Sequence, residues 1–178
     1  MKKPACLLSL CGLMILGCKK TPLPNDPPIN ENELITTVVL QFKDSLNQTQ
    51  SFKFSDLDGP GGNVPIIDTI RLKPQTVYQL TIDFLDESKS PVDSITNEIK
   101  DENDNHLIAF SSALSQLKID VTDQDNNGLP LGLKSLWQVL GTGKGIVRIE
   151  LKHQVGIKNG DPTLGETDVQ VDFPIILQ

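Results

Sequence analysis

The chain has 178 residues, 38% of them hydrophobic, which suffices for one domain with a hydrophobic core and is too short for two domains of ordinary size. Its 23 acidic and 16 basic residues give a net charge of −7, and such a surface repels nucleic acid, so nucleic-acid binding is excluded. All three cysteines lie within the first 18 residues, so no disulfide is expected in the remainder of the chain.

The first 18 residues have the pattern of a bacterial lipoprotein signal. Lys2 and Lys3 precede an apolar run of 13 residues over 5–17, whereas a membrane-spanning helix needs about 20. The run ends in the sequence ILG directly before Cys18, as in the recognition sequence of a lipoprotein signal peptidase. We therefore predict a signal peptide over 1–17, lipidation of Cys18 and attachment to the outer membrane, on its periplasmic or cell-surface side. Loss of the two lysines changes the net charge from −7 to −9.

Residues 19–33 are predicted to form an extended tether between the lipid and a folded domain. The segment holds four of the twelve prolines and shows no hydrophobic periodicity. Fully extended, it would reach about 45 Å at roughly 3.1 Å per residue. The predicted organisation is a signal over 1–17, a lipidated cysteine with its tether over 18–33, and a single domain over 34–178.

From Leu34 onward, apolar residues recur with a period of two, which is typical of strands with one buried face. The exception is 93–102, where Ile95 and Ile99 are four residues apart and predict one short helix. Clusters of Gly, Pro, Asn and Asp separate the strands, so we predict an all-β fold, an antiparallel β-sandwich (immunoglobulin-like or related) of about eight to nine strands. The predicted strands cover 34–42, 52–54, 66–72, 78–84, 106–112, 117–121, 133–140, 146–153 and 169–177.

Several segments in the same order resemble a family of small Bacteroidetes lipoproteins. They are ELITTVVLQF, FSDLDGPGGNVP, DSITNEI, TDQDNNGLPLGL and GETDVQVDFP. That family is often labelled "type 1 periplasmic binding fold superfamily", but the two-lobed α/β fold in this label needs a longer chain with more helices. The resemblance implies a surface or periplasmic lipoprotein whose gene lies near those of outer-membrane receptors and metal homeostasis.

Two Asp-rich loops are candidates for calcium binding. Asp123, Asp125 and Asn127 place oxygen ligands at alternate positions before a glycine, but Lys134 stands where a helix–loop–helix calcium site needs a bidentate Glu. Two interpretations stay open, a looser Ca²⁺ site and a simple turn between strands. The loop 56–62 is a second Asp-Gly turn, and the carboxylates of both loops would converge if the loops lay together at one end of the sandwich.

The two histidines of the chain are candidates for a zinc site. His106 and His153 both fall at strand ends, and His106 follows the acidic run 101–104. Imidazole and carboxylate together are a suitable ligand set for Zn²⁺, which needs three or four ligands. We predict that the two histidines bind zinc with a carboxylate, for which Glu102 is the first choice. The other carboxylates considered are those of Glu98, Asp101 and Asp104.

The sequence lacks the common catalytic motifs, among them Gly-x-Ser-x-Gly, His-Glu-x-x-His, Cys-x-x-Cys and the phosphate-binding Gly-x-x-x-x-Gly-Lys. We therefore expect a non-enzymatic, lipid-anchored binding protein that assists an outer-membrane receptor in the uptake of a metal or small nutrient. The alternative is a structural or adhesive surface module whose Asp-Gly loops are plain turns or bind stabilising calcium. A hydrolase that uses surface carboxylates is the third hypothesis.

Overall fold

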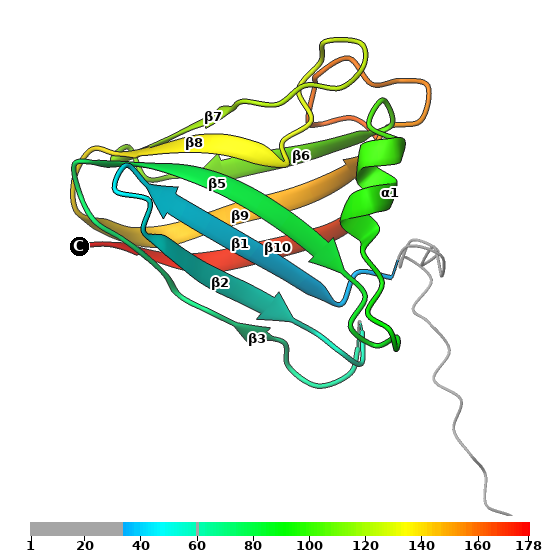
Figure 1. The fold of residues 1–178 in the computed structure, drawn as a ribbon, viewed down its shortest axis with the longest axis horizontal. Coiled ribbons are helices and arrows are strands. Elements are labelled where there is room, and N and C mark those ends of the chain that lie inside the picture. Colours follow the sequence, from blue (N-terminus) through cyan, green and yellow to red (C-terminus); the bar gives the residue numbers. More distant parts are fainter. Residues whose placement is uncertain (1–33, 60) are drawn as a thin grey trace, which may run out of the picture.

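The computed structural model describes residues 34–59 and 61–178, which form two facing β-sheets and one short helix (Figure 1). The predicted all-β sandwich with a single short helix is thereby confirmed, and the described residues contain ten strands instead of eight or nine. The predicted signal peptide, Cys18 and the tether lie outside the described residues. Within the described part of the chain, no helix is long and apolar enough to cross a membrane.

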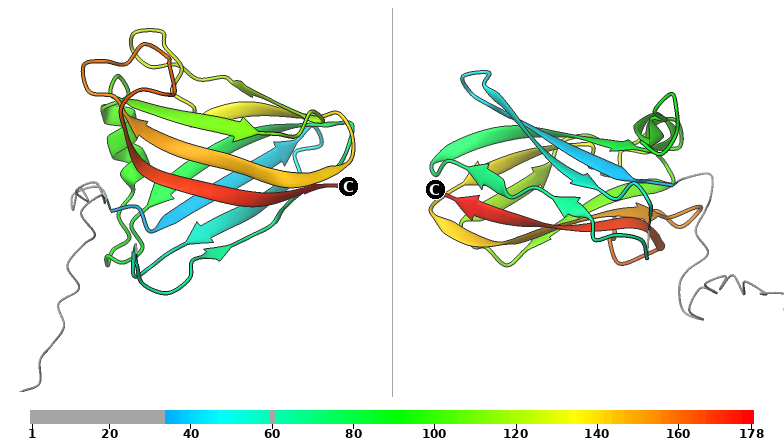
Figure 2. Two further views of the ribbon diagram at one scale, coloured as in Figure 1. Left: turned by 180° about the vertical axis from the view of Figure 1, so that it is seen from behind. Right: turned by 90° about the horizontal axis from the view of Figure 1, so that it is seen from below.

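The first sheet has the strand order β3-β2-β1-β5-β8-β7, and the second has the order β4-β10-β9-β6. Figure 2 shows the second sheet from behind, with β6, β9 and β10 side by side. The strands of the first sheet are β1 (Thr37–Asp44), β2 (Thr49–Ser55), β3 (Ile66–Ile67), β5 (Thr76–Leu85), β7 (Leu117–Val121) and β8 (Lys134–Val139). Those of the second sheet are β4 (Ile70–Leu72), β6 (His106–Ser112), β9 (Gly143–His153) and β10 (Glu166–Leu177).

The predicted strand over 66–72 is divided between the two sheets. Its first part, β3, pairs with β2, and its second part, β4, runs parallel to β10. Between them the backbone N–H of Asp68 donates to the carbonyl of Lys53 (2.9 Å), after which the chain changes sheet. One alternating segment therefore joins the two sheets along one side of the sandwich.

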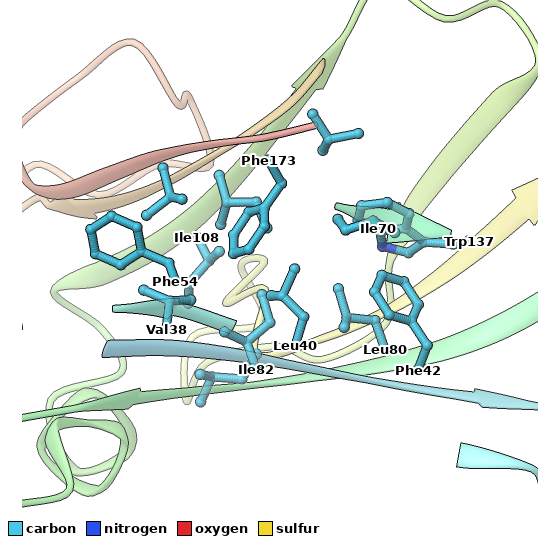
Figure 3. Packing of buried hydrophobic residues seen from close by; sticks show 14 of the residues in the cluster. Val38, Leu40, Phe42, Phe54, Ile70, Leu80, Ile82, Ile108, Trp137 and Phe173 are labelled. Carbon is cyan, nitrogen blue, oxygen red and sulfur yellow. The ribbon is translucent and has the colours of Figure 1, made fainter. Parts of the chain in front are cut away.

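The core lies between the two sheets and contains the inward-facing residues that the period of two predicts (Figure 3). Trp137 from β8 is fully buried and meets Phe42 from β1 at a ring-centroid distance of 5.0 Å and an interplanar angle of 80°. Phe110 from β6 approaches Trp137 edge-on at 6.0 Å. These edge-to-face contacts link both sheets through one large aromatic side chain.

The helix α1 (Ile95–Asp101) covers one end of the sandwich (Figure 1). Ile95 and Ile99 are buried, as their spacing predicts. The hydroxyl of Thr96 accepts a hydrogen bond from the N–H of Phe84 (2.7 Å) and donates one to its carbonyl (3.1 Å). Pairing between β5 and β8 ends at Thr81, so Thr96 satisfies two backbone groups that the sheet leaves without a strand partner.

Thr96→Val is expected to lower the free energy of unfolding by roughly 2 kcal/mol, because it leaves the buried N–H and carbonyl of Phe84 without a hydroxyl partner. Urea unfolding of both proteins measures the difference. Thr81→Val on the exposed face of β5 is the matched control, and its effect should stay within about 0.5 kcal/mol. Equal midpoints for the two variants would show that Thr96 does not hold the helix to the sheet.

Candidate metal centre

The register of two neighbouring strands brings the histidines face to face. His106 opens β6 and His153 closes β9, and the antiparallel ladder pairs these two residues directly. Their rings are stacked, with centroids 4.8 Å apart and an interplanar angle of 7°. His106 is only 2% exposed, whereas 22% of the His153 side chain is exposed, so the pair lies at the partly buried end of the sandwich.

A carboxylate from β10 joins the pair. The pairing of β10 with β9 shifts register between Thr167 and Val169, so that Asp168 is an extra residue at a β-bulge beside His153. One ligand atom from each of His106, His153 and Asp168 lies within 4.8 Å of the other two. The neighbouring strands β6, β9 and β10 thus supply two imidazoles and one carboxylate to the same cluster.

The predicted carboxylate ligand, Glu102, needs correction. Its side chain is exposed, and its backbone carbonyl, not its carboxylate, faces the site at 3.0 Å from Nδ1 of His106. Within the described residues, Glu98, Asp101 and Asp104 do not belong to the cluster either. A carbonyl can only accept, so Nδ1 of His106 donates this hydrogen bond. A hydrogen bond of this kind orients metal-binding histidines in general.

His153 presents a buried nitrogen that the protein does not satisfy. Its Nε2 is inaccessible to solvent and has no hydrogen-bond partner, while its Nδ1 lies 4.0 Å from Oδ1 of Asp168. A buried polar atom without a partner is costly, and such atoms are uncommon in folded proteins. A bound cation would supply the missing interaction.

The dimensions of the cluster fit a metal ion after a small contraction. Zinc ligands lie about 2.0–2.2 Å from the ion, which in a tetrahedral site places them about 3.3 Å from one another. The ligand atoms here are up to 4.8 Å apart, so side-chain rotations have to bring them closer. Three protein ligands leave a fourth position for water or another ligand.

The loop with Asp123, Asp125 and Asn127 has the contacts of a turn. Oδ1 of Asp125 accepts the N–H groups of Asn127 and Leu129, both at 2.8 Å, and Oδ1 of Asp123 accepts that of Gly132 at 2.9 Å. Oδ2 of Asp125 lies 2.8 Å from the ammonium of Lys158. A protein cation thus already compensates this carboxylate, and the geometry favours the turn interpretation over the calcium site.

The second Asp loop does not approach the first. Oδ2 of Asp58 accepts hydrogen bonds from the backbone and side-chain nitrogens of Asn63 (2.9 and 2.7 Å), which closes its own turn. This loop joins β2 to β3, whereas the loop of Asp123 joins β7 to β8, at the opposite edge of the same sheet. The expectation that four carboxylates would converge depended on adjacent loops, and the strand order separates them.

Comparison with known proteins provides no template for this site: no protein-family model, curated protein or solved structure matches the chain. The function is therefore inferred from the partly buried cluster itself.

Proposed function

We propose that the protein is a lipid-anchored, extracytoplasmic binding protein that holds one divalent transition-metal ion through His106, His153 and Asp168 and serves an outer-membrane uptake receptor. The observation that carries this proposal is the partly buried cluster, in which the buried Nε2 of His153 has no hydrogen-bond partner. An imidazole pair with one carboxylate is a ligand set of zinc sites. The lipid anchor is the prediction made for Cys18.

The donor atoms define the class of metal. Two imidazoles and a carboxylate, without a thiolate, suit Zn²⁺ and other divalent ions such as Cu²⁺ or Ni²⁺, and are unsuited to Cu⁺. With neutral imidazoles, the ligand set carries a single negative charge, so it compensates half of the charge of a divalent ion. An open fourth position allows the ion to exchange with a second ligand, as a protein that delivers metal requires. In this proposal the protein binds its ligand and catalyses no reaction.

A structural or adhesive module is the second candidate function. It is favoured by the two Asp loops, which the chain's own N–H groups and Lys158 close as turns, and by the stacked geometry of the two histidine rings. In such a module the histidines would only pack against each other. Metal titration separates the two candidates.

The test is a titration of the purified full-length protein with ZnCl₂ after removal of metal by a chelator. We expect one ion per chain, and no binding after His106→Ala or His153→Ala, because a single imidazole with one carboxylate leaves too few ligands. Asp168→Asn should weaken binding by more than the roughly 10–100-fold that loss of an outer-shell partner costs, because it replaces the anionic ligand by a neutral amide. Bound zinc should also raise the melting temperature, since at about 100 times the dissociation constant it stabilises the native state by about 2.7 kcal/mol.

Glu102→Gln is the matched control, because it removes a carboxylate close to the site in sequence while the backbone carbonyl that holds His106 stays in place. This variant should bind zinc as the wild type does. Stoichiometric zinc in the double variant His106→Ala/His153→Ala would contradict the proposed site. A wild type that binds no zinc, copper or nickel would favour the adhesive module.

A further inference from the structure

Four exposed apolar side chains lie at the end of the sandwich where the described chain begins, three of them in loops and Ile66 at the start of β3. Val64 is 90% exposed, Ile66 74%, Leu57 55% and Val92 54%. We call these four residues the loop patch. Single exposed apolar residues are common, but a group of them on neighbouring loops marks a surface that contacts something else.

The two segments that carry the loop patch are both tied to Thr36, the residue before β1. The N–H of Asp56 donates to the carbonyl of Thr36, and the N–H of Glu87 donates to the hydroxyl of Thr36, both at 2.8 Å. The carboxylate of Glu87 also accepts from Thr37 (2.9 Å) and from the ammonium of Lys53 (2.6 Å). The loop after β2 and the loop after β5 therefore flank the start of β1 (Figure 1).

Leu34, the first described residue, lies at this surface. Cδ1 of Leu34 lies 3.9 Å from the position that a Cβ on Gly59 would take, between Leu57 and Val64 in sequence. Residues 19–33 separate Leu34 from Cys18 and would span about 45 Å at roughly 3.1 Å per residue, the rise of a polyproline II helix. A lipid on Cys18 therefore keeps the loop patch within that distance of the membrane.

We propose that the loop patch is a docking surface for a zwitterionic lipid bilayer, into whose interface its four side chains insert. This inference rests on the proposed lipid anchor. The anchor makes docking intramolecular, so that a small apolar surface suffices where it would not hold an untethered protein. Asp58 within the loop and the acidic surface of the chain disfavour anionic lipids, which is why we specify a zwitterionic bilayer.

Docking in this way determines where the metal centre lies. His106 at the start of β6, His153 at the end of β9 and Asp168 near the start of β10 share the end of the sandwich that carries the loop patch (Figure 1). The bound domain would therefore present its metal-binding end to the membrane and to proteins embedded there.

The experiment uses the full chain, isolated from membranes and reconstituted into phosphatidylcholine vesicles with brominated acyl chains, which quench tryptophan at the bilayer. Val64→Trp places a reporter in the loop patch, and Leu46→Trp is the matched control, since Leu46 is a 76% exposed apolar residue in the turn at the other end. The native Trp137 is fully buried and gives the same background in both. We expect a blue shift and loss of emission at position 64, and emission at position 46 as in lipids without bromine.

Ile66→Asp added to Val64→Trp should abolish the quenching, because a carboxylate in the loop patch would have to lose its hydration to enter the interface. Two further outcomes would overturn the inference. If the protein floats with the vesicles and position 64 is not quenched more than position 46, the docking surface is wrong while the anchor stands. If the protein does not float with the vesicles, the anchor is wrong and the docking surface with it.

Discussion

Lys158→Met is expected to lower the free energy of unfolding by about 3–5 kcal/mol, because it leaves the carboxylate of Asp125 buried without its cation. The side chain of Lys158 is 2% exposed and that of Asp125 is fully buried. The same ammonium donates to the backbone carbonyl of Asn103 at 2.8 Å. One cation therefore holds together the β9–β10 loop, the β7–β8 loop and the segment between α1 and β6.

Urea unfolding measures this loss, and the chain offers a matched surface pair as control. Lys118 lies 2.8 Å from Asp120, but both side chains are well exposed (59% and 42%). Lys118→Met should therefore cost no more than about 1 kcal/mol. Adding Asp125→Asn to Lys158→Met should recover part of the loss, since it removes the uncompensated charge and keeps an oxygen that accepts from Asn127 and Leu129. Similar costs for the two lysine variants would contradict a special role for the buried pair.

The same ion pair makes the stability depend on acid pH. Burial alone would raise the pKa of Asp125, but the ammonium of Lys158 and the N–H groups of Leu129 and Asn127 outweigh it and hold the pKa below its ordinary value. A carboxyl with a lowered folded-state pKa stabilises the fold above its unfolded pKa, which is about 3.9 for Asp. This contribution is lost as the pH falls from about 4 through the lower folded-state pKa.

Gly165→Ala should lower the free energy of unfolding by about 2–5 kcal/mol and weaken zinc binding as well. Gly165 precedes β10 with a φ of +79°, and a Cβ there would overlap the backbone carbonyl oxygen of His153. The left-handed backbone costs a non-glycine residue about 1–2 kcal/mol, and forcing an extra carbon into a packed site adds about 1–3 kcal/mol. Relief of the overlap requires His153 or the start of β10 to move, and both belong to the metal cluster.

Gly128→Ala separates the cost of the left-handed backbone from the cost of the steric overlap. Gly128 has nearly the same φ, +80°, but a Cβ there would have no neighbouring atom within 4 Å. Gly128→Ala should therefore lower the free energy of unfolding only by the backbone penalty of about 1–2 kcal/mol, and zinc binding should be unchanged. If both variants unfold alike and bind zinc alike, the close approach of Gly165 to His153 has no influence on the site.

The fold could be predicted because its main signal is local. A strand with one buried face repeats every two residues, so the inward residues of β1 and β5 can be read without knowledge of their neighbours. The division of 66–72 between two sheets could not be read in this way. Which sheet a residue joins depends on its partner strand, and the alternation in β3 and β4 is the same whether or not the chain changes sheet.

The candidate site also depends on which strands are neighbours, and local alternation does not reveal this. Both histidines were visible as residues at strand ends, but their contact depends on β6 and β9 being neighbours. Asp168 was missed because the inward alternation of Val169, Val171 and Phe173 assigns it to the outer face, until the bulge shifts the register. The acidic run 101–104 before His106 predicts a carboxylate ligand, yet Glu102 is exposed and only its backbone carbonyl approaches the histidine.

The strand β10 separates the metal centre from the C-terminus. It begins beside His153, continues for 12 residues and ends at the far end of the sandwich (Figure 1). At about 3.4 Å per residue it spans roughly 40 Å. A fluorescent protein fused after Gln178 would thus lie at the end of the sandwich opposite to the metal cluster. Its height above a bilayer, measured by energy transfer to labelled lipids, would report whether the domain stands upright or lies flat.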